Sequence, residues 1–265
     1  MRSKKGMSAS ALVVVALLTV FGLATEQFSV DDLAGELLGG GSSSSSSSES
    51  FSSDGSSNVA RAPAPGSSQV GGAAQLSAEE ARDALSGLEV SAAGSMAGYS
   101  REDFDHWENA QDYGWSIPSQ VADPGSCDVR DATLIRDGSN VEVGEYCDVG
   151  SGEWADPYTG QTLTDSSDLD GEHVVPLANA FRSGASSWTE EKKAAYANDP
   201  VVVAATDDGE NQSKGDKGPE AWQPPYEGSH CSYAARWVQI KDAWDLSVTS
   251  DEQAALREML AGCGA

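Results

Sequence analysis

The sequence is short of basic residues and of histidine. Lysine and arginine number 16 against 42 aspartates and glutamates, the formal net charge is −26, and there are only three histidines. A broad basic surface for nucleic acid requires many lysines and arginines to neutralise phosphates, so the composition excludes that mode of binding. Any chemistry on a polyanion would have to rest on local groups and a metal cation.

The N-terminal third lacks the large apolar residues that a folded core needs. Residues 1–30 place basic side chains before an apolar run over residues 11–24, which is typical of a secretory signal and is short for a membrane span. No clear cleavage site follows, so both a cleaved signal peptide and an uncleaved signal anchor fit. Residues 31–76 are rich in Ser, Gly, Ala and Pro, which predicts a disordered linker. We therefore expect a protein that is secreted or tethered outside the cell membrane, with its folded domain at residues 77–265.

The sequence contains no Cys-x-x-Cys motif, and this absence disfavours a structural zinc site. All four cysteines lie in the predicted folded domain, and an even number in an exported chain indicates disulfides. Three pairings are open. Pairing in sequence order, Cys127 with Cys147 and Cys231 with Cys263, would tie each end of the domain onto itself.

Helix and strand signals alternate in the folded part and predict an α+β fold. We expect helices at about residues 77–88, two after Pro176 (the second with a capping box from Ser187 to Glu190), one from about Glu210, and two at the C-terminus, the last capped by Thr249 and Glu252. We expect strands over residues 140–149, after the turn at 156–160, up to Val175, and from Val201 to Ala205, with a helix or a strand over residues 127–138.

One stretch, DGEHVVPLANAF, sets an acid beside a histidine. Pro176 stops the predicted strand, so Glu172 and His173 lie at a strand end. Either they form an ion pair on the surface, or they belong to a site that uses them.

A second strand and a helix with Asn211 and Lys214 follow. Two strands followed by a helix, with an acid–histidine pair on the first strand and Asn211 and Lys214 on the helix, form a ββα-metal arrangement that is suited to phosphodiester hydrolysis. A neutral histidine is the natural base for water near pH 7. Carboxylate and amide oxygens are hard ligands for a magnesium-type cation, which would stabilise charge on the phosphate and the leaving oxygen.

The motifs H-V-V-P, N-D-P and N-Q-S-K-G-D, in this order, resemble the HNH endonuclease superfamily. More closely, the chain is similar to secreted actinobacterial proteins with an HNH domain that is shared with the GmrSD restriction enzymes. The stretches GYSREDFDHW, CDVRDATLIRD, DPYTG, WQPP and CSYAARWVQIKDAWDLSVTSDE also fit that group. The resemblance covers roughly residues 98–263.

The resemblance implies roles for single residues. His173 takes the place of the general base, Glu172 that of the acidic metal ligand before it, and Asn211 that of the helix residue that completes the metal site. Lys214 matches the lysine of N-x-x-K and would contact phosphate. The implied cofactor is a divalent cation, Mg²⁺ or alternatively Mn²⁺. The implied partner is nucleic acid, with DNA as the first expectation, and no protein partner is inferred.

One position departs from the family pattern. Many HNH domains have an asparagine in the second strand, nine residues before the helix asparagine, and this chain has Val202 there. In the family that asparagine helps to orient the general base. Asn198 and Asp199 are the neighbouring residues that could substitute for it.

Arg130, in the CDVRD stretch, is a further candidate because it could reach a phosphate. The structural alternative is an ion pair with Asp128 or Asp131. His106 and His230 are expected to serve packing and loop structure.

Together these features predict an exported, metal-dependent endonuclease with a ββα-metal core, flanking helices and a disordered leader. The rival expectation is a catalytically decayed, envelope-tethered module for binding or structure on the same frame. Val202 and the acidic surface favour the rival, and the set of Glu172, His173, Asn211 and Lys214 opposes it.

Overall fold

The computed structural model describes residues 75–264, so the predicted signal segment and almost all of the predicted linker lie outside the described residues. The described part combines helices with small antiparallel sheets, which confirms the α+β class. No helix in this part of the chain is long and apolar enough to cross a membrane. The α-helices are α1 (Ala78–Gly87), α2 (Val129–Asp137), α3 (Leu177–Arg182), α4 (Glu190–Ala197), α5 (Asp208–Lys214), α6 (His230–Ala243) and α7 (Ser250–Ala261). The strands are β1 (Ser139–Val143), β2 (Val149–Ala155), β3 (Thr162–Asp165), β4 (Leu169–His173) and β5 (Val203–Asp207).

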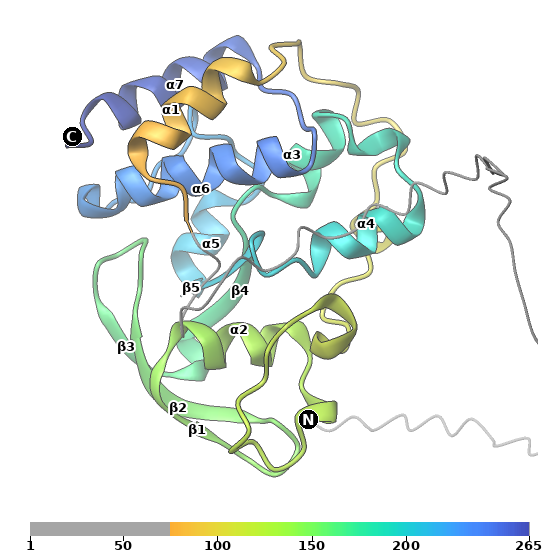
Figure 1. The fold of residues 1–265 in the computed structure, drawn as a ribbon, viewed down its shortest axis with the longest axis vertical. Coiled ribbons are helices and arrows are strands. Elements are labelled where there is room, and N and C mark those ends of the chain that lie inside the picture. The colour runs from red at the N-terminus through yellow and green to blue at the C-terminus, as the bar shows by residue number, and fades with distance from the viewer. Residues whose placement is uncertain (1–74, 265) are drawn as a thin grey trace, which may run out of the picture. The chain divides into compact units, whose positions relative to one another are not determined.

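Helices α1, α6 and α7 pack together at one end of the described part (Figure 1). α1 begins with the predicted capping box between Ser77 and Glu80, and α7 begins with the same arrangement. On α6, Tyr233, Trp237 and Ile240 recur every three or four residues and are buried. α6 therefore supplies much of the largest apolar cluster.

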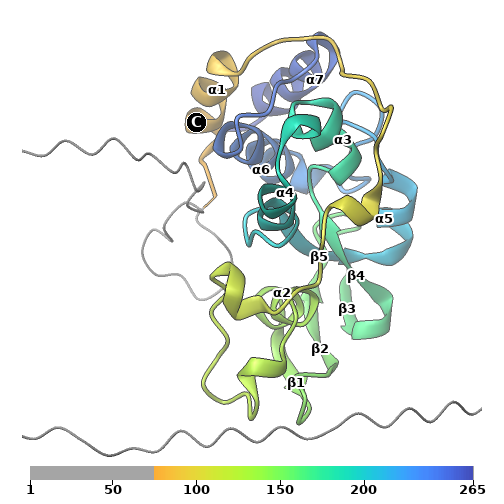
Figure 2. The ribbon, with the colours of Figure 1, turned by 90° about the vertical axis from the view of Figure 1, so that its right-hand side faces the viewer.

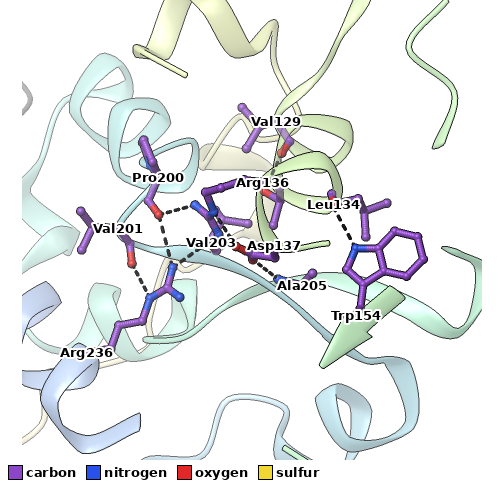
Figure 3. Close-up of polar contacts among 11 residues, drawn as sticks. Val129, Leu134, Arg136, Asp137, Trp154, Pro200, Val201, Val203, Ala205 and Arg236 are labelled. Atoms are coloured by element: carbon purple, nitrogen blue, oxygen red, sulfur yellow. Dashed lines mark hydrogen bonds and ion pairs between the residues drawn. The ribbon is translucent and has the colours of Figure 1, made fainter. Parts of the chain in front are cut away.

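Strands β1, β2 and β3 form an antiparallel sheet at the other end (Figures 1 and 2). The prediction of one strand over residues 140–149 is wrong, because β1 and the start of β2 both fall in this region. A turn separates them, in which the Gly144 N–H donates to the Asp148 carbonyl at 2.8 Å. Trp154 of β2 anchors the sheet on α2, where its indole N–H donates to the Leu134 carbonyl at 2.8 Å (Figure 3).

Strands β4 and β5 form a separate antiparallel pair that contacts α2. Glu172 lies opposite Ala204 in the ladder, and His173 lies opposite Val203. α5 begins directly after β5 and contacts both strands (Figure 2). Strand, strand and helix are thus adjacent in space, although α3 and α4 separate the two strands in sequence.

A pair of arginines holds the backbone that leads into β5. The sequence predicts a strand from Val201, whereas β5 starts at Val203. Arg136 of α2 donates to the carbonyls of Pro200 and Val203 at 2.7 Å each. Arg236 of α6 donates to the carbonyls of Val201 at 2.9 Å and Val203 at 2.8 Å (Figure 3). The carbonyls of Pro200 and Val201, which the prediction placed at or next to the start of the strand, are bound by guanidinium groups, whereas the Val202 carbonyl accepts from the Val174 N–H at 3.0 Å. We call Arg136 and Arg236 the arginine clamp.

The start of α4 also differs from the prediction. Its N-cap is Thr189, whose hydroxyl accepts a hydrogen bond from the Lys192 N–H at 3.3 Å. Ser187 belongs to a preceding 3-10 turn and donates to the Gly184 carbonyl. The prediction of a capping box from Ser187 is therefore wrong, because its hydroxyl is used within that turn.

Both disulfides follow the sequence order. Cys127 is bonded to Cys147, with 5.0 Å between their Cα atoms, and Cys231 is bonded to Cys263, with 5.6 Å. The first bond ties the segment before α2 to the turn between β1 and β2. The second ties the start of α6 to the end of α7.

Candidate active site

Glu172 faces α5, where it forms a buried ion pair. Its Oε1 accepts hydrogen bonds from the ammonium group of Lys214 and, at 3.4 Å, from the hydroxyl of Tyr158. Glu172 is 5% exposed and Lys214 is 0% exposed. Glu172 therefore pairs with Lys214 in the interior. It does not form the surface ion pair with His173 that the sequence offered as the alternative.

The charges of this ion pair depend on each other. Burial raises the pKa of Glu172, while Lys214, Tyr158 and the positive charge of Arg101 act in the opposite direction. Burial lowers the pKa of Lys214, against the attraction of Glu172. Removal of either partner would leave the other charge buried without compensation.

His173 points to the opposite face of β4, because adjacent strand residues alternate. Its ring centroid lies 5.4 Å from that of Trp107 and 5.9 Å from that of His106. Its Nε2 is 2.9 Å from the carbonyl oxygen of Ala197. Since a carbonyl only accepts, Nε2 carries the hydrogen, and the lone pair is on Nδ1. Burial lowers the pKa of His173 to about 3, so the imidazole is neutral near pH 7.

Asn198 holds the surroundings of His173 together. Its side-chain amide donates to the carbonyls of Asp105 and Ala194 at 2.8 Å each, and its Oδ1 accepts from the Glu108 N–H at 3.1 Å. These bonds join the segment with His106 and Trp107 to the end of α4, next to the Ala197 carbonyl. Asn198 does not bind His173 itself and acts through backbone placement.

The other residues considered for this orienting role have different surroundings. Asp199 accepts hydrogen bonds from the Val201 N–H at 2.7 Å and from the Trp244 indole at 3.0 Å. Val202 is 0% exposed and belongs to the main apolar cluster. Neither contacts the His173 ring through a hydrogen bond.

Asn211 lies on α5 over the same face of β4 as Glu172. Its Nδ2 donates to the Oδ2 of Asp170 at 3.0 Å. Asp170 and Glu172 are two residues apart on β4, so their side chains share a face. α5 thus spans β4 with two contacts, Asn211 to Asp170 and Lys214 to Glu172. Asp170 was missed in the sequence, where its spacing of two from Glu172 was the available signal.

Arg130 binds backbone rather than a carboxylate. One of its terminal nitrogens donates to the carbonyls of Ser166 at 3.2 Å and Leu169 at 3.0 Å. It therefore supports the start of β4, next to Asp170. The ion pair with Asp128 or Asp131 that the sequence offers as the structural alternative is not formed.

The DPYTG stretch positions both α5 and Glu172. The Oδ1 of Asp156 accepts from the Asp207 N–H at 2.9 Å, where α5 begins, and its Oδ2 accepts from the Thr159 N–H at 2.6 Å. The next residue but one, Tyr158, reaches Glu172 and packs edge-on against Trp222, with ring centroids 4.9 Å apart. This turn therefore fixes the helix and the carboxylate relative to each other.

Among residues 75–264, no three His, Cys, Asp or Glu side chains gather into a metal-binding cluster. A divalent cation on the α5 face of β4 would take its ligands from Glu172, the Asn211 amide and water. Such an all-oxygen set fits a magnesium-type cation, which usually keeps several waters.

Residues 130–259 match the C-terminal domain of the GmrSD restriction endonucleases. This span includes all the candidate catalytic and metal-binding residues, and the chain belongs to this family. An uncharacterized secreted protein of Arthroderma benhamiae is 45% identical over 190 residues, which are 71% of this chain and 86% of that relative. No solved structure matches the chain. The predicted location outside the cell is confirmed by this relative and by the two disulfides, which persist in oxidising surroundings.

Proposed function

We propose that the protein is an exported, metal-dependent endonuclease that hydrolyses phosphodiester bonds on a ββα-metal core. The family match supports a nuclease domain. The observation that carries the proposal is the state of His173, a neutral imidazole whose Nε2–H donates to Ala197 and whose lone pair is on Nδ1. An imidazole held in one tautomer by a carbonyl is suited to general-base catalysis.

In this proposal the Nδ1 of His173 takes a proton from the attacking water. The positive charge that develops on the ring strengthens the hydrogen bond from Nε2 to the Ala197 carbonyl. A phosphate that enters beside the ring favours the protonated form, which opposes the effect of burial on its pKa. Asn198 acts as a positioning residue because it fixes the backbone around the ring.

Glu172 and Asn211 would hold a divalent cation, Mg²⁺ or Mn²⁺. In this proposal the phosphate lies across the end of β4, where the faces of Glu172 and His173 meet, and the cation would supply stabilisation of negative charge on it and on the leaving oxygen. Lys214 favours the ionised form of Glu172, and Arg130 supports the strand that carries it. The phosphate contact expected of Lys214 from its motif, and that of Arg130, remain predictions. DNA is the expected substrate, and residues 1–30 would direct export or tether the protein to the membrane.

A second candidate function is a catalytically decayed module on the same frame, tethered in the envelope. The observation that favours it is Val202, a buried apolar residue where many HNH domains have asparagine. The acidic composition points the same way, because it gives little general attraction for a polyanion.

A nicking assay separates the two functions. The purified chain is incubated with supercoiled plasmid or with RNA, in Mg²⁺, in Mn²⁺ and in EDTA. His173→Gln serves as the matched variant, since its amide can still donate to the Ala197 carbonyl but is not a base. The proposal expects metal-dependent cleavage that EDTA and His173→Gln abolish. Absence of cleavage of both nucleic acids in either metal supports the decayed module.

A further inference from the structure

The ladder of β4 and β5 brings a threonine to the candidate metal site. Asp170 lies directly opposite Thr206. Opposite residues of an antiparallel pair have their side chains on the same face. The hydroxyl of Thr206 is therefore on the face that carries Asp170 and Glu172, which α5 covers through Asn211 and Lys214.

The hydroxyl of Thr206 is buried and has no hydrogen-bond partner in the described part of the chain. Its residue is 0% exposed. Thr133, which is equally buried, instead donates to the Val129 carbonyl at 2.7 Å. Burial of a polar group without a partner lowers stability, so the unpaired Thr206 oxygen points to a ligand at this position.

Asp170 and Asn211 already have the spacing of two ligands on one cation. The Asp170 Oδ2 and the Asn211 amide nitrogen are 3.0 Å apart. Neighbouring oxygens on an octahedral Mg²⁺, each about 2.1 Å from the ion, are themselves about 3 Å apart. A half-turn of the nearly symmetric amide exchanges its nitrogen for its oxygen. Cation binding would then replace the hydrogen bond by two ligands with little movement.

Asp170 also carries the uncompensated charge on this face. The carboxylate of Glu172 is paired with Lys214, whereas Asp170 forms no ion pair with any residue from 75 to 264. Asp170 and Asn211 are half-buried, so a cation can reach them from solvent. A cation gains more from an unpaired carboxylate than from one whose charge is already neutralised.

We infer that Asp170 and the hydroxyl of Thr206 are ligands of the divalent cation, together with Asn211 and Glu172. This inference rests on the proposed function, and it assigns two residues that the motif does not contain. Water would fill the remaining positions, as is usual for Mg²⁺.

Mn²⁺ binding to the metal-free, full-length protein tests the inference without reference to cleavage. Mn²⁺ is titrated in and followed by the electron paramagnetic resonance signal of the free ion. Asp170→Asn keeps the shape and removes the charge, and Thr206→Val replaces the hydroxyl by a methyl group. Asp168→Asn and Thr164→Val are matched controls, since both residues are exposed on the neighbouring turn and strand.

We expect Asp170→Asn to weaken Mn²⁺ binding at least tenfold and Thr206→Val at least threefold, with both controls like the wild type. Thermal midpoints in EDTA should not fall in either variant, which excludes misfolding as the cause. Wild-type affinity in Asp170→Asn or in Thr206→Val overturns the inference. If Glu172→Gln and Asn211→Ala lose affinity in that case, the proposed function survives. A wild type that binds no Mn²⁺ overturns both.

Discussion

The Nε2 of His173 donates to the main-chain carbonyl of Ala197 across 2.9 Å. The acceptor is the last residue of α4, so the orientation of the proposed base depends on where that helix ends. Both partners are buried. The tautomer of His173 is therefore set by the fold, before any substrate arrives.

We expect His173→Ala to abolish cleavage and also to lower stability. His173 is 4% exposed, so truncation leaves a cavity as well as an unpaired carbonyl. His173→Gln should lose activity by about 10²–10⁴-fold, the range for a general base, with a smaller loss of stability. Turnover on supercoiled DNA and urea unfolding of both variants check this. Wild-type turnover in His173→Gln would show that His173 is not the base.

The free energy of unfolding should decrease in acid because of His173. Its pKa is about 3 in the folded protein and 6.5 ordinarily, so below pH 6.5 the unfolded chain binds a proton that the folded protein does not. Stability from this group is constant above pH 6.5 and falls between pH 6.5 and 3, by at most about 1.4 kcal/mol per pH unit. Urea unfolding from pH 7 to 4 should show a shallower fall in His173→Gln. The matched control is His230→Gln, since His230 also bonds a carbonyl through Nε2. Equal pH dependence in all three proteins would contradict the burial of a neutral His173.

Loss of one partner of the buried ion pair should be costly. Lys214→Met leaves Glu172 buried without its cation, which typically destabilises a protein by about 3–5 kcal/mol. Adding Glu172→Gln to this variant should recover part of the loss, because no charge is then stranded. Thermal or urea unfolding of the two single variants and the double variant measures the coupling. The exposed Lys217 provides the control, and Lys217→Met should change stability by less than about 0.5 kcal/mol.

Val202→Asn should destabilise the protein without accelerating cleavage. Val202 is enclosed in the main apolar cluster, so a new amide would lack partners and cost on the order of 1–3 kcal/mol. The half-buried neighbour in Val201→Asn should be tolerated better. A faster enzyme with an unchanged thermal midpoint would instead mean that the amide reaches His173 and that the family asparagine is simply missing.

Removal of the first disulfide should affect stability more than chemistry. Cys127 and Cys147 are 20 residues apart, and the chain-entropy model assigns such a loop about 3 kcal/mol. The double variant with serine at both positions should lose roughly this amount in urea unfolding while its residual folded fraction keeps normal turnover. Non-reducing peptide mapping of the wild type provides the control for the pairing.

The sequence predicts features that depend on a few neighbouring residues. The capping boxes at Ser77 and Thr249 are present because cap and partner are only three residues apart. The apolar face of α6 could be predicted equally well, because the spacing of three to four residues between its apolar side chains is a local property of the sequence. A strand end shortly before Pro176 was also correct, although β4 ends at His173, two residues before the predicted Val175.

Features that join distant segments could not be predicted in this way. Asn198 acts on backbone groups about ninety residues earlier in the chain. Asp170 becomes relevant only when α5 places Asn211 beside it. The sequence around Lys214 is typical of a polar helix with an exposed basic residue. Its burial follows only from the packing of α5 on β4.

The arginine clamp has a consequence for the order in which the protein is built. Arg136 lies 67 residues before Val203, and Arg236 lies 33 residues after it, yet both bind its carbonyl. During synthesis, which starts at the N-terminus, β4 and β5 are made before Arg236, which binds the start of β5. Such long-range contacts also slow assembly. A nascent chain that ends before α6 therefore contains Glu172, His173, Asn211 and Lys214 but only one of the two guanidinium groups that bind the Val203 carbonyl, so the surroundings of the candidate site are completed only when α6 has been made.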